Sequence, residues 1–157
     1  DIQHVGGMSI GGGTLQGLSR LMLKIRNISN LEALASKGDL SKVNLQIKDI
    51  SQDELEGLPM HATASLFGKA VNNQAEDADV AIGLICLVLE TIGSASVLST
   101  LNSGIKDFVL IGNLTQLSEC HLIFPIIEDL YGVKFHVPEH AVFCTALGAA
   151  LAYESKS

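Results

Sequence analysis

The chain has 157 residues, of which 47% are hydrophobic, so it has the size of one domain and enough apolar content for one core. Only 17% of the residues are charged, which excludes a mainly disordered chain, and the net charge of −7 argues against binding nucleic acid through its phosphates. Tryptophan is absent and aromatic residues make up 4%, so we expect no base-stacking surface either. We therefore expect a single domain over residues 1–157.

The ends of the chain and its cysteine usage favour a cytoplasmic protein. The sequence does not contain the pattern of a signal peptide, a basic segment followed by an apolar stretch. The start at Asp1 leads us to expect the C-terminal part of a longer protein. Three cysteines without a CxxC spacing predict reduced thiols. We expect no metal site, because Pro138 would break a helix shared by His136 and His140.

The most informative feature is a cluster of six glycines in the segment VGGMSIGGGTLQGL. Apolar residues at helical spacing follow it and predict a helix over residues 13–27, with Thr14 as its N-cap. Glycines let a ligand approach the backbone, and the free amides at a helix start favour an anion. We interpret this loop as a phosphate site, with a tight turn that binds nothing as the alternative. The predicted contacts are Gly11, Gly12, Gly13 and Thr14.

Shorter elements are expected next. Residues 30–36 predict a short helix that Gly38 ends, and the alternating residues 43–50 predict a strand. Residues 51–59 form an acidic loop, and residues 61–73 contain small residues followed by a helical turn.

Residues 76–101 are the longest helix candidate. Between residues 80 and 105 the only charged residue is Glu90. Glu90, Gly93 and nearby serines interrupt the apolar stretch, whereas a membrane span needs about 18 or more uninterrupted apolar residues. We expect a core helix that is buried on most sides, with packing against a partner subunit as the alternative.

The C-terminal third alternates between strand and helix. Residues 107–113 predict an apolar strand that ends in Gly-Asn, and Thr115 or Ser118 would cap the helix that follows. Residues 134–137 predict a second strand, and residues 141–154 a small-residue helix suited to packing on a sheet. This order predicts a parallel strand pair with a right-handed crossover.

The end of the first of these strands offers a second glycine-lined edge. A glycine at the carboxyl end of a parallel strand lets a ligand lie against the backbone, so Gly112 and Asn113 are candidate nucleotide contacts. A plain strand-to-helix turn is the alternative. Two such loops on one acidic domain favour a bound nucleotide.

The order of these motifs resembles that of type II pantothenate kinases. The matching segments are HVGGMSIGGGTLQGL, ALASKGDLSKVNLQIKDI, ATASLFG, FVLIGNL and the small-residue C-terminal helix, and they span residues 5–153. These kinases belong to the superfamily of actin, sugar kinases and the heat-shock ATPases. The resemblance implies an α/β fold of the ribonuclease-H-like (actin-like ATPase) type. This C-terminal lobe would have a mixed sheet with helices on both faces, and the N-terminal lobe would lie outside the chain.

The resemblance also implies a function for the whole protein. It would be a homodimer that phosphorylates pantothenate with ATP, the first step of coenzyme A biosynthesis, in a cleft between two lobes. Mg²⁺ and the general base would be held mainly by the N-terminal lobe. Ser65, Phe67 and Gly68 would lie near the nucleotide, together with the glycine loop and the Gly-Asn strand end. Thr63 and Ala64 would help to shape the pantothenate pocket across the dimer.

Two departures from the family bear on activity. Phosphoryl transfer depends on positioning and charge neutralisation, so we expect the chain without an N-terminal lobe to be inactive and to bind nucleotide weakly. The family also has arginine just before the glycine loop, where this chain has His4. Histidine is mostly neutral at pH 7 and offers fewer donors than arginine. His4 is a candidate for a weak phosphate or substrate contact, and a solvated histidine is the alternative.

Three readings of the function stay open at this point. The first is the pantothenate kinase. The second is a catalytically impaired regulatory homologue, which His4 in the arginine position motivates. The third is a related small-molecule kinase with another substrate. None of them involves nucleic acid or a membrane.

Overall fold

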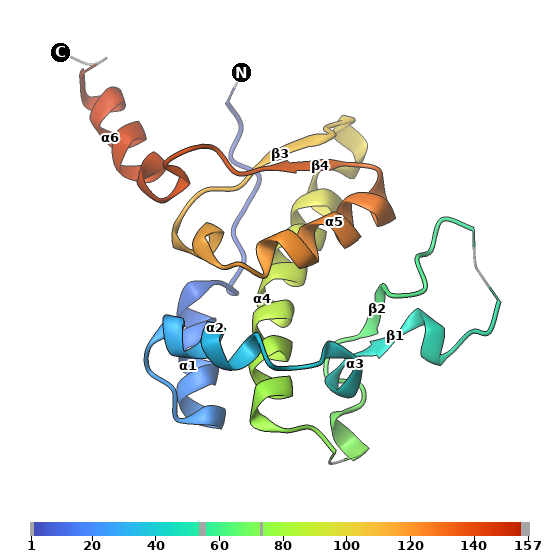
Figure 1. The fold of residues 1–157 in the computed structure, drawn as a ribbon. Coiled ribbons are helices and arrows are strands. Elements are labelled where there is room, and N and C mark those ends of the chain that lie inside the picture. The colour runs from blue at the N-terminus through green and yellow to red at the C-terminus, as the bar shows by residue number, and fades with distance from the viewer. Residues whose placement is uncertain (1, 54–55, 73, 155–157) are drawn as a thin grey trace.

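The chain is built around one long helix, α4 (Figure 1). A computed structural model describes residues 2–53, 56–72 and 74–154. The helices are α1 (Gly12–Leu23), α2 (Ile28–Ala35), α3 (Leu40–Val43), α4 (Asp77–Ser99), α5 (Cys120–Tyr131) and α6 (Cys144–Glu154). The strands are β1 (Leu45–Gln46), β2 (Thr63–Ser65), β3 (Asp107–Val109) and β4 (Lys134–His136). Residues 54 and 55 of the expected acidic loop, and Asn73, lie outside the described residues.

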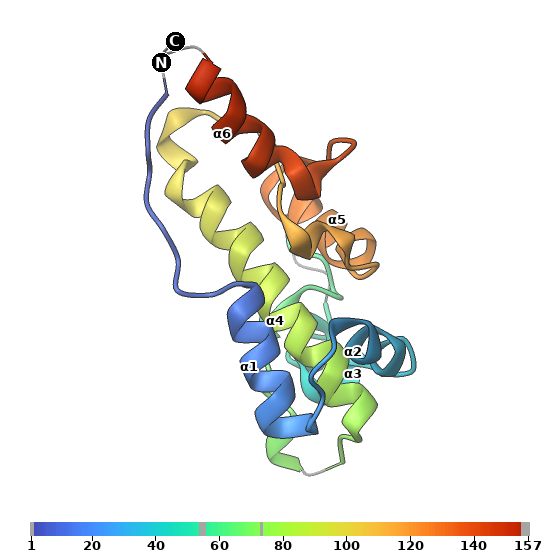
Figure 2. The ribbon, with the colours of Figure 1, turned by 90° about the vertical axis from the view of Figure 1, so that its left-hand side faces the viewer.

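Helix α4 is the core helix that its nearly uncharged sequence predicts. Helices α1, α2, α3 and α5 pack against it, and Leu84, Ile85 and Leu89 on it are almost completely buried (Figures 1 and 2). In the described part of the chain it is the one helix long and apolar enough to cross a membrane by length and composition, but 56% of its most apolar window is buried. Buried core helices of globular proteins share this composition, so the feature carries no membrane assignment.

Helix α1 begins earlier than expected. Its N-cap is Gly11, and Thr14 is the third helical residue instead of the cap. The Gly11 N–H donates to Thr14 Oγ1 over 3.3 Å, and that hydroxyl donates to the Ser9 carbonyl over 3.3 Å. Thr14 thus ties the glycine loop to the first turn, as the third residue of a capping box does.

Helix α1 also ends earlier than expected, at Leu23. Lys24 adopts a left-handed conformation with φ 61°, which stops the helix. Asn27, the last residue of the expected helix, instead caps α2, because its side chain accepts a hydrogen bond from the Ser29 N–H at 2.9 Å.

The predicted strand over residues 43–50 is mostly wrong, because only Leu45–Gln46 is a strand. The Asp39 carboxylate accepts from the Ser41 N–H at 2.8 Å and starts α3. The Asp49 carboxylate likewise accepts from the Gln46 N–H at 2.8 Å and starts a 3₁₀ turn over Ile47–Asp49. Short side-chain acceptors therefore outweigh the alternating pattern.

The described strands form two separate pairs instead of the expected mixed sheet with helices on both faces. Strands β1 and β2 are antiparallel, and β3 and β4 are parallel and connected through α5, which confirms the expected parallel pair. Phe135 of β4 packs on Phe124 of α5 with 4.8 Å between ring centroids. The strands are at most three residues long, so each pair buries few side chains.

Helix α6 does not pack on a sheet as its small residues predict. None of its described residues is buried, and Leu147 and Leu151 are more than half exposed. Figure 1 shows it projecting to one side of the rest of the chain. The small-residue pattern correctly predicts a helix, but not the surface that it contacts here.

Candidate nucleotide-binding site

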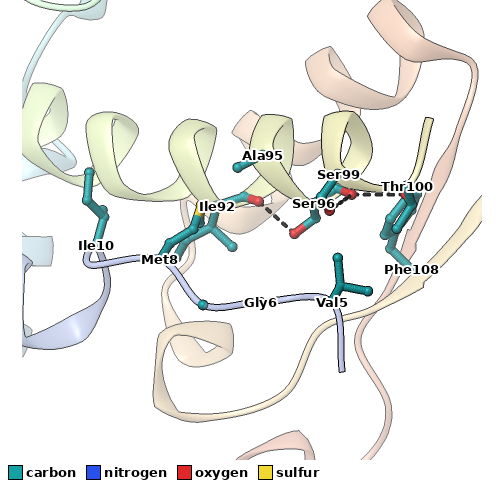
Figure 3. A pocket seen from close by; sticks show the side chains of 11 residues that line it. Val5, Gly6, Met8, Ile10, Ile92, Ala95, Ser96, Ser99, Thr100 and Phe108 are labelled. Carbon is teal, nitrogen blue, oxygen red and sulfur yellow. Dashed lines mark hydrogen bonds between the residues drawn. The ribbon is translucent and has the colours of Figure 1, made fainter. Parts of the chain in front are cut away.

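Two hollows flank the glycine loop. The first, of about 570 Å³, lies between residues 5–10 and the C-terminal half of α4 (Figure 3). The Ser96 hydroxyl donates to the Ile92 carbonyl over 2.7 Å, and the hydroxyls of Ser99 and Thr100 donate to the Ser96 carbonyl. The side-chain hydroxyls of this hollow therefore bind backbone carbonyls of α4, and none of its described lining residues is charged. It is poorly suited to binding a phosphate.

The second hollow, of about 680 Å³, brings together the two loops that the sequence singles out. It lies between the N-terminus of α1, the N-terminal turn of α2 and the segment that follows β3. Its lining consists of Gly12, Gly13, Gln16, Ile28, Ser29, Glu32, Ile111, Asn113, Leu114, Gln116 and Leu117. Of the predicted nucleotide contacts in these two loops, Gly12, Gly13 and Asn113 line this hollow, whereas Gly11, Thr14 and Gly112 do not.

The α1 wall of this hollow is open to an anion. No acidic residue lies in the first turn of α1, so the positive end of the helix dipole is not neutralised there. A Cβ placed on Gly12 would come no closer than 3.8 Å to Leu114, and one on Gly13 would meet nothing within 4 Å. Phosphate oxygens can therefore approach the first amides of the helix directly.

The opposite wall is fixed by Gly112. Its φ of 97° is in the region that favours glycine, and its N–H donates to the Ala141 carbonyl at 2.9 Å. The Thr115 hydroxyl donates to the Gly112 carbonyl at 2.7 Å. Both backbone groups of Gly112 are therefore used within the protein, and the neighbouring Asn113 is the residue that lines the hollow.

Glu32 makes one end of the second hollow chemically different from the end at α1. Of the described residues that line it, Glu32 alone is charged. The Glu32 Oε1 atom accepts from the Ser118 N–H at 3.1 Å and from its hydroxyl at 3.4 Å, which holds the carboxylate in place. A carboxylate repels phosphate and accepts hydrogen bonds from hydroxyl groups. The hollow therefore suits a nucleotide with its phosphates at α1 and its sugar toward Glu32.

Several of the expected site residues lie elsewhere. Thr63, Ala64 and Ser65 form β2, and Phe67 and Gly68 follow it, on the other side of α4 from α1 (Figures 1 and 2). None of these five residues lines the second hollow. Their segment is held there because the Phe67 ring contacts α4. A Cβ added at Gly83 of α4 would lie 2.9 Å from Phe67 Cζ.

His4 is exposed on the segment that precedes α1 and lines neither hollow. Gln16, Ser29 and Glu32 are lining residues that the sequence reading missed. Helical spacing places Gln16 one turn after Gly12, but Ser29 and Glu32 reach the hollow through the packing of α2 on α4, which no local pattern encodes.

A buried polar cluster lies beside β2. The Thr63 hydroxyl donates to Glu90 Oε1 at 2.7 Å, and the Asn44 amide donates to Cys86 Sγ at 3.4 Å. Burial raises the pKa of Glu90, although the Thr63 hydroxyl and the Cys86 thiol act in the opposite direction. Burial also raises the pKa of the Cys86 thiol, so this cysteine is not a reactive thiolate.

The described residues contain no group of three or more His, Cys, Asp or Glu side chains that could hold a metal ion. His136 instead pairs with Asp107, at 2.8 Å between Nε2 and Oδ1. The residues of the second hollow, with one carboxylate, do not by themselves fit a Mg²⁺ site, which prefers several oxygen ligands.

Comparison with known proteins identifies the family. A family model described as Fumble matches residues 1–152. This chain belongs to the Fumble family. It is 32% identical to a type II pantothenate kinase of Staphylococcus epidermidis over 95% of its length, and 31% identical to that of Staphylococcus haemolyticus over 94%. It is 35% identical to pantothenate kinase 2 of Arabidopsis thaliana over 97% of its length.

This chain matches only a part of each of these relatives. The chain spans 58% and 57% of the two staphylococcal kinases and 18% of the plant protein, and it corresponds to the C-terminal part of the kinases. The resemblance to type II pantothenate kinases is thereby confirmed.

Proposed function

We propose that this Fumble-family chain is the nucleotide-binding half of a cytoplasmic pantothenate kinase with an actin-like ATPase fold. The whole protein would transfer a phosphoryl group from ATP to pantothenate, the first step of coenzyme A biosynthesis. The observation that carries the proposal is the second hollow, of about 680 Å³, which is lined by Gly12 and Gly13 of the glycine loop and by Asn113 of the Gly-Asn strand end. The names of the relatives support pantothenate as the substrate.

The chain's own residues would act by binding and orientation. Gly12 and Gly13 would bind phosphate oxygens through their amides, and Asn113 would contact the nucleoside from the opposite wall. Glu32 would direct the sugar hydroxyls away from the phosphate end. The remaining expected nucleotide residues, Ser65, Phe67 and Gly68, are separated from this hollow by α4 and would contact nucleotide only in a larger assembly.

A second copy of the chain would complete the pantothenate side. Ala64 and Ser65 are exposed, and Thr63 is only partly buried, so a further surface is needed to enclose a ligand there. Leu98, Leu101 and Ile105 near the end of α4 are each about half exposed or more. An exposed apolar group of this kind is typical of an interface, which supports the proposed homodimer.

Turnover needs groups that the hollow does not contain. Phosphoryl transfer requires neutralisation of the phosphate charge and a base for the attacking hydroxyl. None of the described residues that line the hollow is a cation, and Glu32 is held by Ser118 beside the expected sugar. Mg²⁺ would supply charge neutralisation from a site outside these residues. We therefore expect the isolated chain to bind ATP weakly and to turn over nothing.

A coupled assay on the full-length protein and on residues 1–157 tests this proposal. We expect ATP-dependent phosphorylation of pantothenate by the full-length protein and none by residues 1–157. Full-length protein that binds ATP without turnover would favour the impaired regulatory homologue, consistent with the exposed His4. Turnover of pantetheine or a hexosamine in preference to pantothenate would favour a kinase with another substrate. Turnover of pantothenate by residues 1–157 would refute the two-part arrangement.

A further inference from the structure

The one charged residue in the middle of α4 has a specific partner. Glu90 is the only charge between residues 80 and 105, and its Oε1 accepts the Thr63 hydroxyl proton at 2.7 Å. Glu90 is only partly exposed, and a buried or half-buried carboxylate is costly unless it is paired. Nothing in the proposed nucleotide site uses this residue, although it lies beside the expected substrate segment.

The segment from Thr63 to Phe67 is attached to α4 at both ends. At one end Thr63 donates to Glu90. At the other, the Phe67 N–H donates to Asn44 Oδ1 at 3.0 Å, while the Asn44 amide donates to Cys86 Sγ at 3.4 Å. Asn44 is completely buried, and Cys86 lies one turn before Glu90 on α4. The position of Thr63 and the direction of its hydroxyl are therefore fixed by α4.

The direction of the hydroxyl decides what Thr63 can bind. A hydroxyl has one proton to donate and two lone pairs to accept with, whereas an ionised carboxylate only accepts. Because the proton points at Glu90, only the lone pairs of Thr63 Oγ1 are left for a ligand. A ligand group that meets Thr63 must then be a donor, such as a hydroxyl or an amide N–H, and a carboxylate is disfavoured.

We propose that Glu90 is a positioning residue that makes Thr63 a hydrogen-bond acceptor for the hydroxyl or amide N–H of the substrate. This inference rests on the proposed function, in which Thr63 faces pantothenate, a molecule with two hydroxyls, one amide N–H and a carboxylate. It adds an orientation to that function: the hydroxyl and amide end of the substrate lies at Thr63, and the carboxylate end points away from Glu90.

The test measures KM and kcat of the full-length protein for pantothenate at saturating ATP. Glu90→Leu removes the acceptor and releases the Thr63 proton, and Thr63→Val removes the hydroxyl. We expect each to raise the KM for pantothenate about 10-fold, the usual effect of one lost hydrogen bond in a ligand site, with little change in kcat or in the KM for ATP. The double variant is expected to lose no more than either single variant.

Conservative variants separate this role from a merely structural one. Glu90→Gln keeps an acceptor oxygen and Thr63→Ser keeps the hydroxyl, so both are expected to retain the wild-type KM. Thr91→Val is the matched control, because the Thr91 hydroxyl donates to the Leu87 carbonyl of its own helix. An analogue that lacks the donor facing Thr63 should show a raised KM with the wild type and no further rise with Thr63→Val.

The outcomes distinguish the two levels of the proposal. Unchanged KM for pantothenate in Glu90→Leu and Thr63→Val, with turnover intact, overturns the role of Glu90 alone. An equal rise in the KM for pantothenate and for ATP shows general structural damage and also overturns it. If Glu90→Leu does not fold, Thr63→Val carries the same expectation. Wild-type protein that neither binds nor phosphorylates pantothenate overturns the proposed function, and this inference with it.

Discussion

Replacing Gly13 with alanine should stabilise the fold and weaken ATP binding at the same time. Gly13 and Gly17 both lie in α1 with φ values outside the positive region, and a Cβ at either position meets nothing within 4 Å. The added methyl group therefore costs no packing strain. Alanine in place of a helical glycine contributes about 0.5–1 kcal/mol, and less at Gly13 because it lies in the first turn.

Apart from this smaller gain in stability at Gly13, the two variants differ in what they do to the second hollow. Gly13 lines it and Gly17 does not. A Cβ at Gly13 would stand where a phosphate oxygen approaches the amides and would remove about one hydrogen bond to a charged group, worth about 1.5–3 kcal/mol. That corresponds to a rise in the dissociation constant for ATP of about 10- to 150-fold. Gly17→Ala, the matched control, should leave ATP binding unchanged.

Calorimetric titration of ATP and urea unfolding of the full-length protein measure both effects. The expected combination is weaker ATP binding with an equal or higher midpoint of unfolding for Gly13→Ala, and only the higher midpoint for Gly17→Ala. Equal dissociation constants for ATP in the two variants would refute the assignment of the α1 N-terminus as the phosphate site. A loss of stability in Gly13→Ala would show that the glycine is needed for the fold.

Three further predictions concern packing, pH and assembly. Gly93→Ala should lower the unfolding free energy by about 1–3 kcal/mol in denaturant titrations, because its Cβ would lie 2.5 Å from Ile127 Cδ1. Burial acts to raise the pKa of Asp79, but backbone N–H groups and a lysine hold it below its usual value, so the carboxylate stabilises the fold above about pH 4 and this stabilisation is lost as the pH falls further. Acid unfolding of Asp79→Asn should accordingly show a weaker pH dependence than that of wild type. Leu98→Glu should shift the full-length protein from the proposed dimer to a monomer in light scattering, and an unchanged mass would refute an interface at this residue.

The sequence predicts the helices well where one signal dominates. The nearly uncharged stretch that forms α4 has no competing interpretation as a surface helix, and Gly132 ends α5 in a left-handed conformation as glycines do. The strand over residues 43–50 fails because Asp39 and Asp49 accept local backbone protons. Such hydrogen bonds involve two or three neighbouring residues and leave the alternation of polar and apolar residues unchanged.

In the candidate site, too, some features follow from local sequence patterns and others depend on tertiary contacts. Both loops of the second hollow follow from local glycine patterns, and they meet because the parallel pair brings the end of β3 toward α1. The separation of Phe67 from that hollow follows from its contact with Gly83, sixteen positions later in the chain. Glu32 reaches the hollow because α2 packs on α4 and the Ser118 N–H binds the Glu32 carboxylate, and no periodicity in the sequence specifies these contacts.

The contact between Phe67 and Gly83 has a consequence for how this family can vary. Phe67 adopts φ 56°, a conformation that costs a non-glycine residue about 1 kcal/mol. The packing of its ring against α4 at Gly83 must offset this cost. A smaller residue at 67 alone loses this packing, and a side chain at 83 alone would collide with the Phe67 ring, whereas a side chain at 83 together with a smaller residue at 67 avoids the collision. The two positions should therefore covary among Fumble sequences, with an aromatic residue at 67 accompanied by glycine at 83 and a small residue at 67 permitting a side chain there.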